Sequence, residues 1–168
     1  MAKYSGKYRG TVIDNVDPMM TGRLLVQVPD VSNVLPSTWA LPCLPFAGSQ
    51  SGFYAVPAIG SGVWVEFEQG DPDYPIWVGC FWGSGGDVPS QAVAGPPGVQ
   101  QVCIQTTGQN MLLISDVPGP SGGILLQSST GALISISDTG ITISNGQGAS
   151  IALTGPSVTL NDGALAVT

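Results

Sequence analysis

The chain contains no histidine, and this absence removes the commonest general base of enzymes. Ser-His-Asp and Cys-His mechanisms and histidine-rich zinc sites are therefore excluded. Glu66 and Glu68 share one face of an expected strand at about 7 Å, a separation that a glycosidase pair could use. The competing interpretation is a solvated strand face or a subunit contact. We predict no enzyme activity, no catalytic residue, no cofactor and no metal site.

Basic residues are scarce as well, because four of them stand against eleven acids and the net charge is −7. Proteins hold phosphate backbones with clustered lysine and arginine, so direct nucleic-acid binding is not expected. Only 9% of the residues are charged, which is low for a soluble monomer. Part of the surface is therefore expected to be covered in an assembly. The four basic residues are Lys3, Lys7, Arg9 and Arg23.

Long apolar runs are also missing. No stretch approaches the ~18 residues of a membrane span, and the opening residues have no apolar signal core. We expect the protein to be made and first assembled in a cytoplasm. The cysteines Cys43, Cys80 and Cys103 form an odd set without CxxC spacing. This pattern favours buried thiols in a reducing compartment over disulfides.

Glycine and proline are abundant, at 24 and 14 residues, and 43% of the chain is apolar. Regular alternation without a helical period predicts an all-β chain. In residues 101–168 the only charged side chains are Asp116, Asp138 and Asp162, each beside turn-forming residues. Apolar residues recur there two apart, and such side chains lie on one face of a strand. The pairs are Ile134 and Ile136, Ile141 and Ile143, Ile151 and Leu153, Val158 and Leu160, and Leu165 and Val167.

This repeat of short strands and turns predicts a fibrous or solenoid architecture. Strands of four or five residues bury little apolar surface against a backbone entropy of about 1 to 2 kcal/mol per residue, so one tail should not be stable alone. Three chains around one axis would place each apolar pair against the same pair of two neighbours. Strands stacked about 4.7 Å apart would give a rod on the order of 40 Å long.

Residues 1–83 have longer alternating segments and hold all four tryptophans. Five strands in this length predict a small closed barrel, because closure removes exposed sheet edges. The Gly/Pro-rich stretch 84–100 has no apolar period and is interpreted as a linker to the repeat domain, 101–168. The expected barrel strands are Tyr8–Val16, Gly22–Pro29, Thr38–Leu44, Val63–Glu68 and Ile76–Phe81.

The barrel region also carries an ordered motif in the segment GSGVWVEFEQGDPDYPIWVGCFWG, from Gly60 to Gly83. Its centre is a Gly-Asp-Pro turn, Gly70, Asp71 and Pro72, in which Gly tolerates positive φ and the Asp carboxylate can accept backbone N–H groups. A calcium site at Asp71 and Asp73 is the alternative to a simple turn. Upstream, TVIDNVDPMMTGRLLVQVPDV has Asp-Pro and Gly-Arg around a turn. Together these blocks resemble the OB-like domain of the baseplate spike family of contractile-tailed phages, P2-like phages and type VI secretion systems.

The resemblance implies an N-terminal OB-like five-stranded barrel followed by a C-terminal intertwined triple-stranded β-helix, which forms a homotrimeric needle. It implies a structural central spike of a contractile tail that docks to hub or tail-tube proteins and pierces the target envelope mechanically. The location would be a virion tail baseplate or an injection particle, assembled in the host cytoplasm, with a membrane only as target. Where larger members carry a cell-wall hydrolase, this chain has only the linker.

Two contact regions follow from this interpretation. The four basic residues, Lys3, Lys7, Arg9 and Arg23, are candidates for docking to an acidic hub, with ordinary solubilising charge as the alternative. The uncapped C-terminal strand predicts a small tip protein in contact with Leu165, Val167 and Thr168.

Two rival functions remain open. One is a carbohydrate- or receptor-binding tail module, in which exposed tryptophans stack on sugar rings, although packing and subunit contacts also use tryptophan. The other is a wall-degrading enzyme. The tryptophans concerned are Trp39, Trp64, Trp77 and Trp82.

Overall fold

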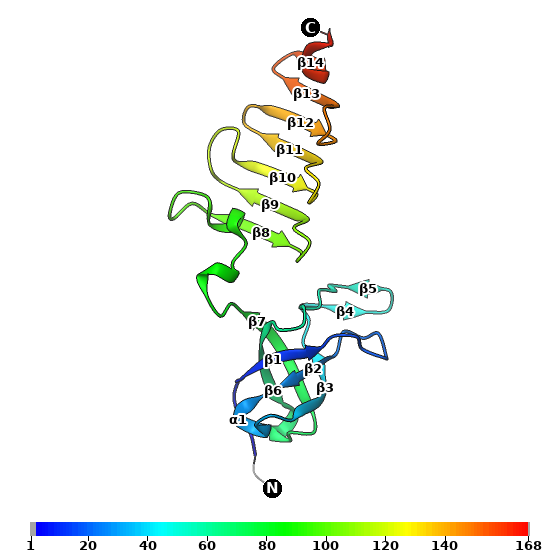
Figure 1. Cartoon of the computed structure of the whole chain (residues 1–168), viewed down its shortest axis with the longest axis vertical. Coiled ribbons are helices and arrows are strands. Elements are labelled where there is room, and N and C mark those ends of the chain that lie inside the picture. Colours follow the sequence, from blue (N-terminus) through cyan, green and yellow to red (C-terminus); the bar gives the residue numbers. More distant parts are fainter. Residues whose placement is uncertain (1–2, 168) are drawn as a thin grey trace. The chain divides into compact units, whose positions relative to one another are not determined.

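The computed structural model describes residues 3–167 and divides the chain into two compact units, Met1–Gly85 and Gly86–Thr168 (Figure 1). Both units are built from strands, and the helical elements are single short turns. The expectation of an all-β chain is confirmed.

The first unit is a closed barrel with the strand order β1-β2-β3-β7-β6. Neighbouring strands are antiparallel, except for β3 and β7, which are parallel. All five expected strands are present, so the predicted barrel is confirmed. The strands are β1 Tyr8–Asp14, β2 Leu24–Gln27, β3 Pro36–Pro42, β6 Gly62–Phe67 and β7 Pro75–Phe81.

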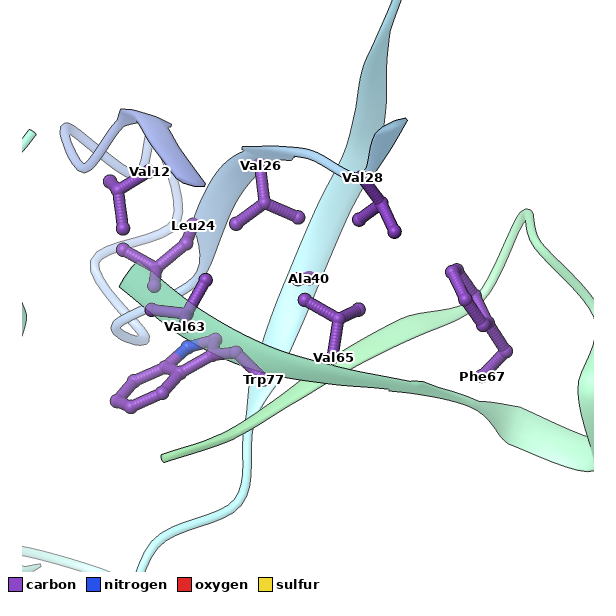
Figure 2. Close-up of a cluster of buried hydrophobic side chains, with 9 residues drawn as sticks. All are labelled: Val12, Leu24, Val26, Val28, Ala40, Val63, Val65, Phe67 and Trp77. Carbon is purple, nitrogen blue, oxygen red and sulfur yellow. The ribbon is translucent and has the colours of Figure 1, made fainter. Parts of the chain in front are cut away.

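Alternation along these strands fills the barrel. On β6 the side chains of Val63, Val65 and Phe67 are buried and point inward, as their spacing predicts, while the residues between them are only half-buried. Figure 2 shows these side chains converging with those of the other strands on one cluster. The cluster consists of Val12, Leu24, Val26, Val28, Ala40, Val63, Val65, Phe67 and Trp77.

Three elements of the first unit were not expected from the sequence. A one-turn helix, α1 (Pro29–Ser32), follows β2, and a 3-10 turn, η1 (Glu68–Gly70), joins β6 to β7. A two-stranded arm, β4 (Ala47–Gly48) and β5 (Ser51–Gly52), leaves the barrel after β3. These elements are too short to give a periodic signal.

Two 3-10 turns, η2 (Gly85–Asp87) and η3 (Ser90–Val93), lie within the stretch interpreted as a linker. An antiparallel sheet follows, in which each strand pairs with its neighbours in sequence. The expected apolar pairs all fall on its strands. These are β8 Gln101–Gln105, β9 Met111–Ser115, β10 Gly123–Gln127, β11 Leu133–Ser137, β12 Gly140–Ser144, β13 Ser150–Thr154, β14 Ser157–Leu160 and β15 Leu165–Val167.

The expectation of three buried thiols is wrong for the single chain. Cys43 and Cys80 are exposed and Cys103 is half-buried. Cys43 lies in the loop after β3, and Cys80 lies near the end of β7, opposite Val63 of β6. The number and spacing of the cysteines bear on disulfides and not on the exposure of each thiol, so this pattern could not predict burial.

Candidate functional site

The sheet of the second unit carries two columns of apolar residues along its whole length. Ile136 lies opposite Ile124 on one side and Ile141 on the other, and Ile134 lies opposite Leu126 and Ile143. Residues opposite each other lie on the same face of a sheet, so each column is continuous across the strands. We call the two columns the apolar ladder. One column is Val102, Ile114, Ile124, Ile136, Ile141, Leu153, Val158 and Val167, and the other is Ile104, Leu112, Leu126, Ile134, Ile143, Ile151, Leu160 and Leu165.

The apolar ladder is open to solvent in the single chain. Exposure of its large side chains runs from 37% at Ile141 to 56% at Leu165, and only Leu112 and Leu160 fall below this range among those described. From β11 onward the opposite face carries mainly serine, threonine and alanine, such as Ser135 opposite Thr142. A contiguous exposed apolar surface of this length marks an interface.

Side chains in the turns tie alternate hairpins together along one sheet edge. Asn110 Oδ1 accepts a hydrogen bond from the Ser129 backbone N–H at 3.1 Å, and Asn161 Oδ1 accepts one from Ser150 N–H at 3.0 Å. Between these two ties, Gly131 and Gly146 approach so closely that a Cβ on Gly146 would lie 2.7 Å from the Gly131 carbonyl carbon. We call this series the edge seam. It links turns that are not consecutive in the chain.

The three acids of residues 101–168 lie in turns, as their neighbours in sequence predict. Asp116 directly follows β9, and Asp138 lies between β11 and β12, where its Oδ2 accepts a hydrogen bond from Gly119 N–H at 3.1 Å. Asp162 lies in η4 (Asn161–Gly163) with a φ of +54°.

Of the four basic candidates, two are engaged in ion pairs. Lys7 Nζ pairs with Glu66 Oε1. Arg23 Nη2 donates to Asp17 Oδ1 at 2.6 Å, and its guanidinium lies 5.6 Å from the centroid of the Trp39 ring. Both charges are therefore compensated within the barrel.

The other two basic residues make different contacts on the barrel. The Arg9 guanidinium stacks over the rings of Trp64 and Phe81 at 5.6 and 5.5 Å. Lys3 lines an open depression of about 480 Å³ together with the Gly70-Asp71-Pro72 turn. The described contacts therefore do not gather the four side chains into one cluster.

The turn at Gly70 has the geometry that its residues predict. Gly70 adopts a φ of +80°, and Asp71 Oδ1 accepts a hydrogen bond from Asp73 N–H at 3.0 Å. No group of three or more His, Cys, Asp or Glu side chains within residues 3–167 is arranged to hold a metal ion. Among those same residues, no helix has the length and apolar character needed to cross a membrane.

A buried acid that the sequence reading missed organises the loop between β1 and β2. The Asp17 carboxylate accepts hydrogen bonds from the backbone N–H groups of Met19, Thr21 and Arg23, from the Thr21 hydroxyl and from the Arg23 guanidinium. The hydrogen bond from the Arg23 side chain is the main cause that holds the pKa of Asp17 well below its usual range. The donors of Met19 and Thr21 also lower this pKa, whereas burial raises it. In the sequence, the Asp-Pro and Gly-Arg pairs at the two ends of this loop were the features that could have indicated the Asp17–Arg23 contact.

Three of the four tryptophans have partners within the first unit. Trp77 is buried and its Nε1 donates to the Gly22 carbonyl at 3.1 Å. Trp64 packs on Phe81 with ring centroids 5.0 Å apart, and Trp39 lies beneath Arg23. Only Trp82 is exposed, at 63%. This distribution fits packing better than a sugar-stacking surface.

The C-terminal contact residues lie at the last strand of the sheet. Leu165 and Val167 belong to β15, which pairs with β14 on one side and is the edge strand of the order within the chain. Leu165 is 56% exposed. Thr168, the third predicted residue, lies outside the described residues.

Comparisons with known proteins match both units. Residues 8–82 match the family model of the type VI secretion system/phage-baseplate injector OB domain. Residues 101–166 match the family model of the phage baseplate V C-terminal trimerisation domain. The first match spans the barrel strands, and the second spans the sheet from β8 to β15.

Two curated relatives come from Vibrio cholerae serotype O1. The actin cross-linking toxin VgrG1 is 54% identical over 43 residues, which are 26% of this chain and 4% of the toxin. The type VI secretion system spike protein VgrG3 is 42% identical over 62 residues, 34% of this chain and 6% of the relative. The matched regions thus span less than a tenth of either relative.

The barrel and the apolar ladder therefore define a structural spike protein of an injection apparatus, with a trimerisation domain behind an OB-like domain. The chain belongs to the phage baseplate V family, which includes the injector OB domains of type VI secretion systems. The resemblance seen in the sequence is confirmed, and a phage tail or injection apparatus is its setting.

Proposed function

We propose that three copies of this chain form the central spike of a contractile tail or injection particle, with their apolar ladders facing a common axis. The observation that carries the proposal is the ladder itself, since its residues are apolar at every cross-strand pair and exposed in one chain. Burying them between chains contributes roughly 25 cal/mol per Å² of apolar surface. The serine- and threonine-rich face would then be the outer surface of the needle.

The function proposed for this trimer is mechanical. A rod with a dry axial core and hydrogen-bonded strands across its length would concentrate contraction force on a small area of the target envelope. The edge seam supports this role, because it resists sliding between hairpins that are not neighbours in sequence. No step of bond chemistry is needed for piercing.

Docking at the two ends completes the proposal. The barrel would bind the hub or tube end, with Lys3 and Arg9 as the basic side chains not engaged in the ion pairs of Lys7 and Arg23. A small tip protein would contact the β15 end at Leu165 and Val167, and at Thr168 beyond it. The position of β15 at the end of the sheet, where it pairs with β14 alone within the chain, supports a contact there.

The test is the mass of the purified full chain in solution by light scattering. A trimer, three times the chain mass of 17.1 kDa, is the expected species at micromolar concentration. A stable monomer would contradict the proposal. For the tip, particles purified with every other component but without a tip-like polypeptide would count against that contact.

A further inference from the structure

The barrel exposes large apolar side chains at one place where two loops meet. The arm, which we define as residues 46–54 around β4 and β5, exposes Phe46, Phe53 and Tyr54 by 60%, 45% and 69%. The β1–β2 loop exposes Val16, Met19 and Met20 by 74%, 65% and 84%. A Cβ placed on Gly22 of this loop would lie 3.3 Å from the Tyr54 ring, so the arm and the loop are neighbours. We call these six side chains the arm patch.

The arm patch is held in a fixed shape. Asp17 ties down the β1–β2 loop, and Asn15 Nδ2 donates to the Pro57 carbonyl at 2.9 Å, which joins the loop to the chain beyond the arm. At the base of the arm, Leu44 and Val56 pack against the barrel core. A preorganised apolar surface loses little conformational entropy when it binds, so this arrangement favours a docking surface.

The chemistry of the arm patch limits its partner. The sequence has no Asp, Glu, Lys or Arg between Asp30 and Glu66, a stretch that includes the whole arm. The centres of protein interfaces are depleted in charge and enriched in aromatic residues and methionine. The partner surface must therefore be apolar as well, and an acidic or phosphate-bearing surface does not fit.

We propose that the arm patch of each barrel docks on the barrel of a neighbouring copy of the chain. This inference rests on the proposed trimer, because a trimerisation domain over residues 101–166 would hold three covalently attached barrels in one particle. Covalent attachment gives effective concentrations of about a millimolar, at which a modest apolar contact is occupied. In a ring of three copies, the arm patch of one barrel must contact a different surface on the next barrel.

The barrel offers an apolar surface to receive the arm. Ile13, Ile59 and Trp82 are exposed by 41%, 61% and 63%. The Gly60 N–H donates to the Val12 carbonyl at 2.9 Å, and Gly62 pairs with Phe81, so the chain segments that carry these three side chains run side by side. We infer that the arm patch contacts this surface on the next copy.

Photo-crosslinking within the purified full chain tests the inference. The photoreactive residue p-benzoylphenylalanine replaces Phe46 in one variant and Phe53 in a second, so that a folding defect in one leaves the other informative. The matched control places it at Val34, which is 79% exposed in the turn after α1. We expect covalent dimers and trimers from positions 46 and 53, with adducts in residues 8–85 of the neighbouring copy, and at least tenfold less from position 34.

Light scattering of the same samples separates this inference from the proposed function. A trimer without adducts between chains from positions 46 and 53, or with adducts only in residues 101–166, overturns barrel docking and leaves the spike intact. Equal crosslinking from position 34 also overturns it, because the contact would then be nonspecific. A monomer overturns the proposed trimer and the inference with it.

Discussion

Asp17 has a side chain only 3% exposed, although it lies in a loop whose neighbouring residues are open to solvent. Its hydrogen bonds give the loop from β1 to β2 a single shape. The unfolded-state pKa of an aspartate is about 3.9, and the folded value of Asp17 lies below it. The carboxylate therefore contributes its full stability above about pH 3.9, and this contribution is lost as the pH falls below that value.

We predict that Asp17→Asn lowers the thermal midpoint of the barrel at pH 7 and reduces the loss of stability between pH 5 and pH 2.5. The amide cannot accept all the donors that surround the carboxylate, and it does not titrate. Circular dichroism melts at several pH values measure both effects. Asp30→Asn, at an exposed acid in α1, is the control. Unchanged acid sensitivity in Asp17→Asn would show that other acids control it.

Gly62 is required by the aromatic stack on the outside of the barrel. A Cβ at this position would lie 2.8 Å from the Phe81 ring, which itself packs on Trp64 and beneath Arg9. We predict that Gly62→Ala destabilises the barrel by about 1–3 kcal/mol, because the ring must move out of a well-packed position. Urea denaturation followed by tryptophan fluorescence measures this change.

The matched control for this substitution is Gly85→Ala. A Cβ on Gly85 meets nothing within 4 Å, so this variant should unfold like the wild type. Equal stability of the two variants would mean that the Phe81 ring relaxes without cost.

At the scale of elements, the edge seam explains how hairpins of four or five residues hold their order. Each hydrogen bond of the seam joins turns that lie on the same sheet edge and are separated by one turn on the other edge. Pairing between neighbouring strands does not make this connection. We predict that Asn110→Ala costs about 1 kcal/mol, the usual net contribution of one hydrogen bond. Asn161→Ala should cost more, because Asn161 has a φ of +48°, which alanine adopts less readily than asparagine. The amides of Ser129 and Ser150, which lose their acceptors, should exchange hydrogen faster.

Hydrogen exchange with mass spectrometry measures the seam in the full chain. Gln147→Ala is the control, because its exposed side chain lies in a turn of the same edge. If exchange at Ser129 and Ser150 stayed at the wild-type rate in the Asn variants, the ties would have no role in stability.

At the scale of the whole molecule, the apolar ladder decides assembly. We predict that Ile134→Asp with Ile143→Asp abolishes the trimer at micromolar concentration, because unpaired carboxylates at an interface core cost several kcal/mol each. The matched control is Ser135→Asp with Thr142→Asp, an equivalent cross-strand pair on the opposite face. Light scattering should give a trimer for the control and a smaller species for the ladder variant; the reverse result would place the axis on the serine face.

The hub-docking hypothesis also concerns the whole molecule, and the structure sharpens its test. Arg23 is unsuitable for charge reversal, because it supports Asp17. We predict that Lys3→Glu with Arg9→Glu reduces incorporation of the spike into purified particles about tenfold, since each exposed ion pair contributes up to about 1 kcal/mol. Lys7→Glu, at a residue already paired with Glu66, should reduce incorporation less. Wild-type incorporation of the double variant would rule out basic docking.

Much of the architecture follows from the sequence alone. Alternation of apolar residues predicted the five barrel strands and the inward face of β6, and the pairs from Ile134 to Val167 predicted the strands from β11 to β15. These features are local, because a strand with one apolar face specifies its own burial. The ordered Gly, Pro and Asp positions between residues 60 and 83 identified the family.

Only the tertiary structure decided how distant residues meet. No periodic signal connects Asp17 with its ring of donors, Arg9 with Trp64 and Phe81, or the turns at Asn110 and Ser129. The arm also escaped the sequence, because strands of two residues leave no pattern, and the exposure of Cys80 escaped it because cysteine count and spacing do not report burial. Sequence fixes which face of each strand is apolar, whereas the register between strands decides that these faces align into one continuous ladder.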